Sequence, residues 1–380
     1  MTTKVLDLPE NKWESVMLEL LSDTPIQLNG VNKHDIMVSH PDFYKRVLQE
    51  GSIGLGESYM DGWWHCDQLD QLFYYLLKYH VDEKKPANIK DTLFVIQSRL
   101  FNMQSKKRAW MVGEEHYDLG NDLYERMLDP YMQYSCGYWK DATDLKTAQE
   151  NKLKLICEKL QLQEGETLLD IGCGWGGLSE YAAKNYGVKV TGVTISKEQQ
   201  AYGMERCKGL PVDLRLCDYR DLNETFDKIV SVGMFEHVGP KNYQTYFDVV
   251  SRCLKPGGLF LLHSIGSNET QVNVDPWINK YIFPNGVLPS MEQISQVSQG
   301  SLVMEDWHNF GADYDKTLMA WKENFEKSWI DIQGNYSSRF YRMFYYYLCA
   351  CAGAFRARNI QLWQVLFSKE GVEGGIRVPR

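Results

Sequence analysis

A glutamate and a histidine directly follow an apolar run that reads as a buried strand. The run covers residues 229–235, the pair is Glu236 and His237, and glycines stand on both sides. A carboxylate or an imidazole at a strand tip commonly transfers protons. His263 ends a second apolar run, LFLLH, and is therefore expected to face the same cleft as Glu236. His237 is expected to point elsewhere and to be structural, provided that strand alternation continues.

A glycine loop follows another apolar run in LLDIGCGWGG. It contains Gly172, Gly174, Gly176 and Gly177, and glycine lets the backbone approach a ligand closely. The spacing G-x-G-x-G differs from the dinucleotide pattern, and Asp170 precedes a loop that has no Lys or Arg. This disfavours a diphosphate and favours a ligand with positive charge, such as a sulfonium with an ammonium group. A dinucleotide loop, or a tight turn without any ligand, remains an alternative.

Polar residues end the next two predicted strands. An acid often binds the ribose hydroxyls at the end of the second strand, but this chain has Thr194 there, so the contact is missing or moved to Gln199. The third strand ends in CDYRD, where Asp218, Tyr219 and Arg220 could flank an adenine. Each signal is weak alone, but their order along the chain is that of one nucleoside pocket.

The elements that must position these residues alternate between strands and helices from about residue 165. Five β-α units predict an α/β fold with a parallel, doubly wound sheet. Two late strands around a helical region at 315–358 indicate a seven-stranded variant. The expected strands are 167–172, 188–195, 212–218, 226–233, 257–265, 301–311 and 359–369.

Helix signals lie between these strands. Gly187 is placed to end a helix, and Ser196 with Gln199 three residues later predicts a capping box. Pro240 fits the first turn of a helix that the PGG of residues 256–258 would end.

The first hundred residues are expected to be mainly helical. Residues 11–21 and 69–80 carry apolar side chains at helical spacing, whereas 50–64 are glycine-rich and turn-like. A basic stretch at 104–110 marks a boundary. We therefore expect a helical N-terminal domain at 1–103 for membrane docking or dimerisation, a linker at 104–122, and a catalytic domain at 123–380 with a helical insertion at about 312–358.

Composition excludes several classes of protein. The net charge of -9 disfavours nucleic acid as a partner. Nine cysteines without a CxxC pair indicate a reducing cytoplasm and neither a disulfide framework nor a zinc or other metal site. The N-terminus lacks a signal layout, and the longest apolar run, 343–355, is too short to span a bilayer. Any membrane contact is expected to be peripheral.

Several motifs together resemble the cyclopropane fatty acid synthases and the related mycolic acid cyclopropane synthases. They are LLDIGCGWGGLSEYAA, VTGVTISKEQ, GMFEHVG, LKPGG, GEEHYDLGNDLY and DPYMQYSCGYW, with GSIGLGESYMDGWW typical of the phospholipid-modifying branch. The resemblance implies a Rossmann-like class I methyltransferase sheet. It also implies methylene transfer from S-adenosylmethionine to the cis double bond of phospholipid acyl chains.

The resemblance assigns roles to particular residues. Around a bound bicarbonate it places Cys136, Glu236, His263, Tyr314 and the backbone near Ile265. Cys351 matches a cysteine that we treat as lining the site and include among the candidate catalytic residues. Together with Asp170 and Asp218, the expected cofactor contacts are Tyr134, Ser135, Gly172, Cys173, Gly174, Trp175, Gly176, Gly177, Thr194, Ile195, Ser196, Gln199, Tyr219 and Arg220.

The implied chemistry explains why such groups are needed. An alkene that attacks a sulfonium methyl becomes a carbocation, which must lose a proton before water traps it. Bicarbonate anchored by Glu236 is the expected base, inside a dry pocket lined by aromatic rings. The candidate rings, more than half of them expected only to pack in the core, are Tyr314, Trp321, Phe325, Tyr336, Phe340, Tyr341 and Phe344.

The expected partners are the inner face of the membrane and a second copy of the chain. Docking could use basic side chains at 84–85 and 106–108, although a solvated linker is an equal alternative. An ordinary methyltransferase acting on a soluble acceptor and a non-catalytic lipid-binding protein are the alternative functions.

Overall fold

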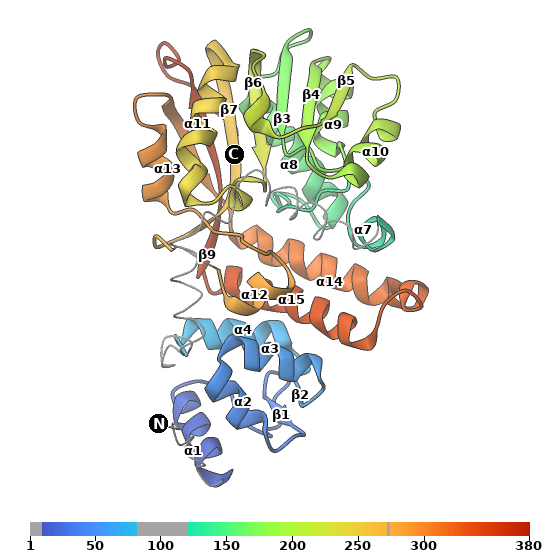
Figure 1. Ribbon diagram of the computed structural model, residues 1–380, viewed down its shortest axis with the longest axis vertical. Coiled ribbons are helices and arrows are strands. Elements are labelled where there is room, and N and C mark those ends of the chain that lie inside the picture. Colours follow the sequence, from blue (N-terminus) through green and yellow to red (C-terminus); the bar gives the residue numbers. More distant parts are fainter. Residues whose placement is uncertain (1–9, 82–120, 272–273) are drawn as a thin grey trace, which may run out of the picture.

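The computed structural model describes residues 10–81, 121–271 and 274–380, and in this part a seven-stranded sheet forms the upper layer (Figure 1). Its strand order is β5-β4-β3-β6-β7-β9-β8. The first five strands of the sheet are parallel, and β9 runs antiparallel to both β7 and β8. The predicted α/β architecture is therefore confirmed. The strands are β3 Thr167–Ile171, β4 Lys189–Thr194, β5 Val212–Leu216, β6 Phe226–Val232, β7 Leu254–Ser267, β8 Val303–Asn309 and β9 Ile360–Ser368.

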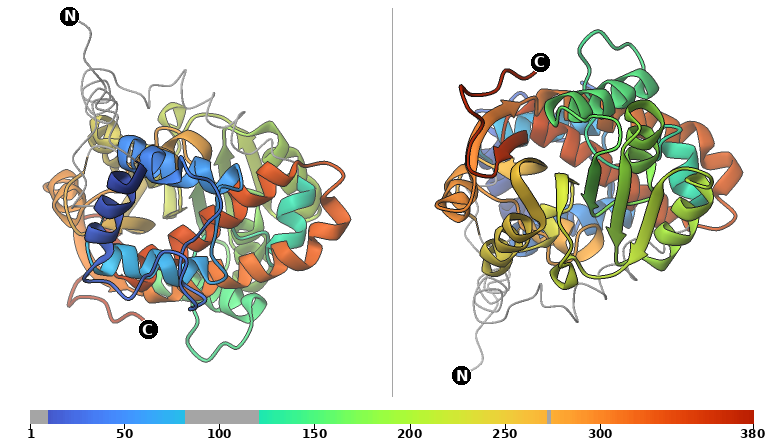
Figure 2. Two further views of the ribbon diagram at one scale, coloured as in Figure 1. Left: turned by 90° about the horizontal axis from the view of Figure 1, so that it is seen from below. Right: turned by 90° about the horizontal axis from the view of Figure 1, so that it is seen from above.

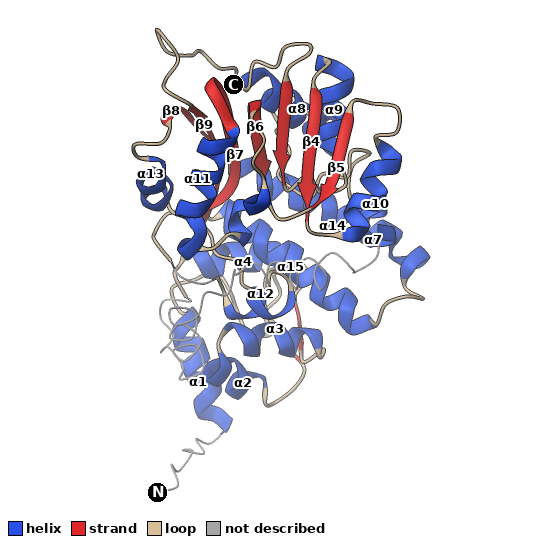
Figure 3. Ribbon diagram, turned by 45° about the horizontal axis from the view of Figure 1, so that its top comes forward, coloured by secondary structure: helices blue, strands red, loops and turns tan. Residues whose placement is uncertain are grey.

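The central strands are apolar on both faces because helices cover the sheet on both sides. The arrows of β3, β4 and β5 in Figure 3 point toward the layer that holds α14 and α15. The carboxyl ends of the parallel strands therefore meet at one edge, above the long helices. The helices of this half are α7 Asn121–Met127, α8 Leu145–Lys159, α9 Gly177–Tyr186, α10 Lys197–Arg206, α11 Tyr243–Cys253, α12 Pro276–Tyr281 and α13 Met291–Ser298.

The helix-end signals at Gly187 and Ser196 have different outcomes. Gly187 ends α9 in the left-handed conformation, as expected. Ser196 caps α10 by accepting the Gln199 N–H, but the reciprocal half of the capping box is wrong. The Ser196 N–H donates to the Thr194 hydroxyl oxygen at 3.2 Å, and that hydroxyl donates to Gln199 Oε1 at 3.0 Å. The Thr194 hydroxyl therefore takes both bonding partners of the expected box, so the Gln199 side chain bonds to Thr194 and not to the Ser196 N–H.

The helix predicted after Pro240 starts later than expected. Pro240 opens a 3₁₀ turn, Pro240–Asn242, and α11 follows it. The PGG of residues 256–258 does not end this helix, because β7 already begins at Leu254. The register of β6 and β7 shifts between Phe226 and Lys228, so the glycines form an irregular start of the strand.

The described N-terminal residues form four helices and a two-stranded ribbon. The predicted helices at 11–21 and 69–80 are confirmed as α1 and α4, whereas the predicted turn at 50–64 is wrong because α3 occupies most of it. The glycines of α3 serve close packing: a Cβ on Gly56 would lie 2.3 Å from the Trp277 ring, and one on Gly54 would lie 2.4 Å from a backbone oxygen. The elements are α1 Glu10–Leu21, β1 Met37–Val38, α2 Phe43–Glu50, α3 Ser52–Met60, β2 Trp64–His65 and α4 Leu69–Lys78.

Two long helices, α14 Ala312–Ile332 and α15 Ser338–Arg356, lie between the sheet and the N-terminal helices (Figures 1 and 2). They connect β8 to β9, as the predicted insertion requires. One continuous apolar core includes side chains from α1–α4 and from α14 and α15. The predicted domain boundary and linker, and the basic side chains at 84–85 and 106–108, lie outside the described residues apart from the linker's last two positions.

No helix in the described part of the chain is both long and apolar enough to cross a lipid bilayer.

Candidate active site

A cavity of about 170 Å³ lies at the carboxyl ends of the parallel strands. It receives side chains from β3, β4 and β6, from the turn after β5, and from the segment before α8. All but two of the residues predicted to contact the cofactor line it: Tyr134, Ser135, Asp170, Gly172, Cys173, Gly174, Trp175, Thr194, Ile195, Ser196, Gln199, Asp218, Tyr219 and Arg220. The sheet topology thus brings together positions that span almost ninety residues of sequence.

The glycine loop divides into two parts with different roles. Gly172 and Gly174 line the cavity and have positive φ angles of 84° and 53°. Gly176 and Gly177 do not line it. Gly176 precedes α9 in the left-handed conformation, and a Cβ on Gly177 would lie 1.9 Å from the Tyr131 carbonyl oxygen. These two glycines therefore form the turn and the packing that support the loop.

Asp170 supplies a carboxylate at the floor of the cavity. It is buried, and it accepts a hydrogen bond from the Ser179 hydroxyl at 2.9 Å. Burial raises the pKa of Asp170 to about 6, against the opposing effects of that hydrogen bond and of Lys152. At neutral pH the group is mainly ionised and can pair with a cationic part of a ligand.

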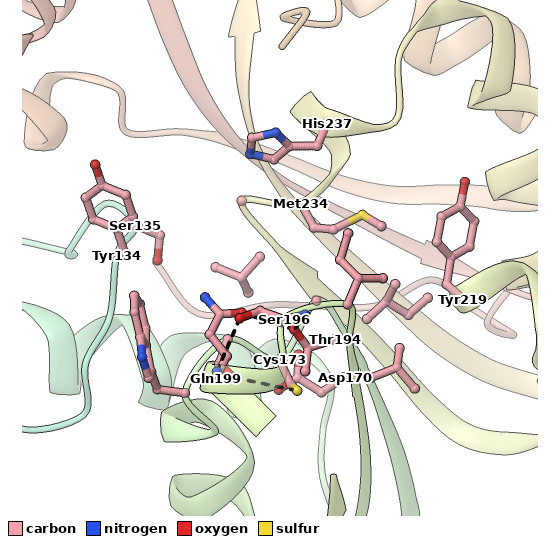
Figure 4. Close-up of a pocket in the computed structure, with 18 of the residues that line it drawn as sticks. Tyr134, Ser135, Asp170, Cys173, Thr194, Ser196, Gln199, Tyr219, Met234 and His237 are labelled. Atoms are coloured by element: carbon pink, nitrogen blue, oxygen red, sulfur yellow. Dashed lines mark hydrogen bonds between the residues drawn. The ribbon is translucent and has the colours of Figure 1, made fainter. Parts of the chain in front are cut away.

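One end of the cavity carries an aromatic ring and an ion pair whose charges cancel. Tyr219 lies at one end and Tyr134 with Ser135 at the other (Figure 4). Arg220 Nε donates to Asp218 Oδ1 at 2.8 Å, so the cation and the anion at the Tyr219 end neutralise each other. This end offers a ring face and little net charge, which suits a purine.

Several lining residues escaped the sequence interpretation. His237 was expected to point away from the site, but Glu236 and His237 lie in a 3₁₀ turn, Phe235–His237, and His237 lines the cavity (Figure 4). That expectation was wrong because strand alternation stops at Val232. Met234 lies in the same motif and could have been found. Pro284 and Asn285 carry no sequence signal, since a distant loop brings them in.

Glu236 is held beside β7 by a hydrogen bond to the backbone. Its Oε1 accepts the Ile265 N–H at 2.6 Å, whereas its Oε2 is buried and has no hydrogen-bond partner among the described residues. Burial raises the pKa of Glu236 to about 7, and the Ile265 hydrogen bond opposes the rise. A carboxyl group that titrates near neutrality, with one oxygen unused, can accept a proton.

His263 lies two residues before Ile265 on β7 and is fully buried. Its Nδ1 is 3.3 Å from Gln364 Nε2, and its Nε2 has no partner within the described part of the chain. Burial lowers the pKa of His263 well below its usual value, and the nearby Lys152 and Lys159 lower it further. The imidazole is therefore neutral and is a potential donor or acceptor at Nε2.

Cys136 and Tyr314 are also buried, and both remain protonated. Burial raises the pKa of each well above its usual value, and Cys136 and Glu236 are among the neighbours that raise the pKa of Tyr314 further. Cys351 is partly buried, and desolvation raises its pKa to about 12, which argues against a thiolate nucleophile. The structure thus places Tyr314 near Glu236, and also near Cys136 and Cys351.

Aromatic side chains connect the cavity to the long helices. The Tyr134 and Tyr347 hydroxyls are 2.9 Å apart, and the rings of Tyr134 and Trp321 are 5.1 Å apart. Tyr314 stacks on Phe355 with 4.4 Å between ring centroids. Of the rings expected to line the pocket, Tyr314, Trp321, Phe325 and Phe344 are buried, and Tyr336, Phe340 and Tyr341 are half-buried.

Comparisons with known proteins agree with this arrangement. The family model of mycolic acid cyclopropane synthetase matches residues 104–365. The chain is 66% identical to the cyclopropane-fatty-acyl-phospholipid synthase of Escherichia coli K12, over 99% of this chain and 98% of that protein. Two solved structures from the same fold, cyclopropane synthase MmaA2 from Mycobacterium tuberculosis and mycolic acid cyclopropane synthase CmaA1 complexed with SAH and CTAB, each give a TM-score of 0.65 and 31% identity over 68% of this chain and 98% of theirs. The class I methyltransferase fold is confirmed.

Proposed function

Because the chain belongs to the mycolic acid cyclopropane synthetase family, we propose that it transfers a methylene group from S-adenosylmethionine to unsaturated acyl chains of membrane phospholipids. The product is a cyclopropane ring at the former cis double bond. The observation that carries the proposal is Glu236: a buried carboxyl group with one oxygen that has no partner among the described residues, next in sequence to His237 of the cavity wall and near Tyr314 of the aromatic core.

The cavity suits the methyl donor in its distribution of charge. Bound S-adenosylmethionine supplies an activated methyl group on a sulfonium. Asp170 would pair with the ammonium of its amino-acid part, and Tyr219 would stack beside the adenine. The Thr194–Gln199 segment would contact the ribose through backbone groups and Ser196. Gly172 and Gly174 would admit the ligand close to the backbone.

The side chains around Glu236 suit removal of a proton next to a carbocation. Cys136 and Tyr314 stay neutral and cannot trap the cation as a thiolate or phenolate would. The Ile265 N–H holds Glu236 in place at 2.6 Å, which keeps its carboxylate from collapsing onto the cation as an ester. Glu236 then accepts a proton directly or orients a smaller base.

Bicarbonate fits this constellation as that smaller base. The buried Glu236 Oε2 and His263 Nε2, which lack partners among the described residues, are the atoms that would hold it. The Tyr314 hydroxyl would join them, with the Cys136 thiol, which in this structure donates to the Gly137 carbonyl oxygen at 3.2 Å. The Ile265 N–H, expected from the family pattern near the anion, is already bonded to Glu236, so its part here is to orient that carboxylate. Bicarbonate would supply a small proton acceptor that is not tethered to the chain.

The helices α14 and α15 are the proposed slot for the acyl chain. Their inward faces carry rings that exclude water and stabilise a cation by roughly 0.5–2 kcal/mol each when desolvated. Each methylene that leaves hydrocarbon for water costs about 0.8 kcal/mol. The enzyme must therefore work at a bilayer surface, and we propose peripheral association with the inner face of the membrane. The homodimer stays a prediction.

Isotope labelling of the product tests the function. Cells that express the chain are given methionine with a trideuterated methyl group, and their phospholipids are analysed by mass spectrometry. We expect unsaturated chains to gain one CD2 unit in a ring, because one deuteron must leave before the ring closes. A CD3 group on the acceptor would instead indicate ordinary methyl transfer, and unchanged lipids together with no binding of S-adenosylmethionine would favour a non-catalytic lipid-binding protein.

A further inference from the structure

A lysine lies fully buried beneath the segment that carries Tyr134 and Ser135. Lys152, on α8, has no exposed surface, and its Nζ donates to the Ser135 hydroxyl oxygen at 2.9 Å and to Gln133 Oε1 at 2.5 Å. Both acceptors line the cavity. Gln149, one turn earlier on the same helix, donates to the Ser135 carbonyl oxygen at 2.8 Å. One face of α8 thus fixes the wall of the cavity at Ser135.

The charge of Lys152 has no direct counter-ion in the described part of the chain. Its two acceptors are neutral, and no carboxylate lies within salt-bridge distance of its Nζ there. Asp129 is a nearby buried acid, but its two carboxylate oxygens accept hydrogen bonds from the backbone N–H groups of Tyr131 and Gln133, each at 2.8 Å. Burying an ammonium without a partner is costly, so a binding partner that arrives with the ligand would stabilise it.

The hydroxyl of Ser135 can transmit this charge into the cavity. Because its oxygen accepts from the ammonium, its own hydrogen is left to donate, and the described residues offer it no acceptor. A hydroxyl that accepts from a cation is a stronger donor toward an anion. Ser135 lies at the end of the cavity remote from Tyr219 and from the neutralised Arg220 (Figure 4).

We propose that Lys152, acting through Ser135, forms the carboxylate-binding end of the cavity and so selects ligands with a free α-carboxylate. The inference rests on the proposed function, because the carboxylate is that of the amino-acid part of S-adenosylmethionine. Lys152 is a positioning residue in this arrangement, and Asp170 serves the ammonium of the same ligand part. Burial lowers the pKa of Lys152 to about 8, which leaves it mainly protonated at neutral pH.

The competing explanation is purely structural: the positive charge of Lys152 would only offset the negative charges of the buried Asp129 and Asp170 carboxylates. The two explanations predict that replacing Lys152 lowers the affinity for different sets of ligands. If Lys152 acts on the carboxylate, its removal weakens only ligands that have one. If it only supports the fold, its removal weakens every nucleoside ligand alike.

Calorimetry on the full chain separates them with two ligands, S-adenosylhomocysteine and its decarboxylated analogue S-adenosyl-3-thiopropylamine. For Lys152→Met we expect the affinity for S-adenosylhomocysteine to fall by about tenfold or more, the size of a hydrogen bond to a charged group, while the affinity for the analogue changes by less than about threefold. Lys159→Met is the matched control. It also removes a fully buried lysine from α8, but that lysine pairs with Asp306 at 3.4 Å, away from the cavity. We expect the control to lower stability and to leave the ratio of the two affinities unchanged.

The proposal would be overturned if Lys152→Met lowered the affinities for both ligands equally. It would also be overturned if Lys159→Met lowered the affinity for S-adenosylhomocysteine as selectively as Lys152→Met does. If Lys152→Met does not fold, Ser135→Ala gives the same test, with the same carboxylate-selective loss expected. Failure of the unmodified chain to bind S-adenosylhomocysteine at all would instead contradict the proposed function. A variant that binds both ligands normally but needs more bicarbonate for turnover would assign Lys152 to the anion near His263 and also overturn the proposal.

Discussion

At the scale of single residues, burial sets the protonation of each group near the proposed reaction. Glu236 is kept near the midpoint of its titration, whereas Cys136, Tyr314 and His263 are kept neutral. A general base works best when its pKa lies near the working pH. The site therefore combines one group that can take a proton with a thiol and a phenol that stay protonated and so lack the negative charge that would draw them to the cation.

We expect Glu236→Gln to bind S-adenosylhomocysteine normally and to lose about 10²–10⁴-fold in turnover, the usual contribution of a general base. The amide oxygen can still accept the Ile265 N–H, so the local structure should persist. Calorimetry and a methylene-transfer assay measure the two effects. Glu205→Gln, which replaces an exposed carboxylate paired with Lys208, is the control and should leave turnover unchanged. Turnover near that of the unmodified chain would remove Glu236 from the mechanism.

The same carboxyl group should make stability depend on pH. Its pKa rises from 4.5 in the unfolded chain to about 7 in the folded one, so the folded state binds more protons between these values. The free energy of unfolding then falls as pH rises through this window. Between about pH 5 and pH 8, the stability of the unmodified chain relative to Glu236→Gln should fall by roughly 2 kcal/mol. Urea unfolding of both proteins at the two pH values measures this, and a parallel response would show that Glu236 ionises normally.

At the scale of elements, glycines set how closely the helices approach each other. Gly56 of α3 faces the Trp277 indole of α12, and a Cβ on Gly353 of α15 would lie 2.6 Å from Phe73 and 2.7 Å from the Tyr74 nitrogen on α4. These glycines weaken the helix signal in the sequence, yet they permit the contact that holds the N-terminal helices on the catalytic layer. Packing therefore outweighs local propensity here.

Gly56→Ala should lower the free energy of unfolding by about 1–3 kcal/mol, because the new methyl group would overlap a rigid, buried ring. Helix propensity alone would favour alanine by about 1 kcal/mol, so the sign of the change tests the packing. Gly334→Ala is the control, since a Cβ there meets nothing within 4 Å. It should alter stability by less than about 0.5 kcal/mol. Denaturant unfolding measures both variants, and a stabilised Gly56→Ala would contradict the tight approach.

At the scale of the whole molecule, the N-terminal helices and the helices below the sheet share one core. Tyr346 of α15 lies 4.4 Å from Trp277, 4.9 Å from Phe73 and 5.5 Å from Tyr59, measured between ring centroids. Arg342 adds hydrogen bonds to the Tyr59 and Trp64 carbonyl oxygens. The predicted N-terminal unit is therefore expected to stabilise the helices that form the proposed acyl slot.

Arg342→Gln should cost about 1.5–3 kcal/mol, because its hydrogen bonds to backbone carbonyls are charge-assisted and partly buried. Arg339 lies one turn before Arg342 on α15 and forms an exposed ion pair with Asp61. Arg339→Gln removes this pair and should lower the free energy of unfolding by less than about 1 kcal/mol. Unfolding followed by fluorescence and by circular dichroism should show one transition for the unmodified chain, as expected for a continuous core. Equal costs for the two variants would mean that the buried bonds add nothing beyond a surface pair.

The order of strands and helices, the glycine loop, the polar residues at the strand ends and the family could all be predicted without the structure. Those signals are local, because periodicity, turns and caps act over a few residues. The cavity residues at the strand ends could be named in advance, since these ends meet at one edge of an open α/β sheet, and Tyr134 and Ser135 followed from the family motifs, whereas His237, Pro284 and Asn285 were missed.

Contacts between distant segments could not be predicted in this way, because they form only when the chain folds. The hydrogen bond from Ile265 to Glu236, the packing of Gly56 against Trp277 and the buried Lys152 under Ser135 all join residues well separated in sequence. The 3₁₀ turn that carries His237 is local, but no periodic pattern announces it. Burial, and with it the ionisation of Glu236, exists only once those neighbours exclude water.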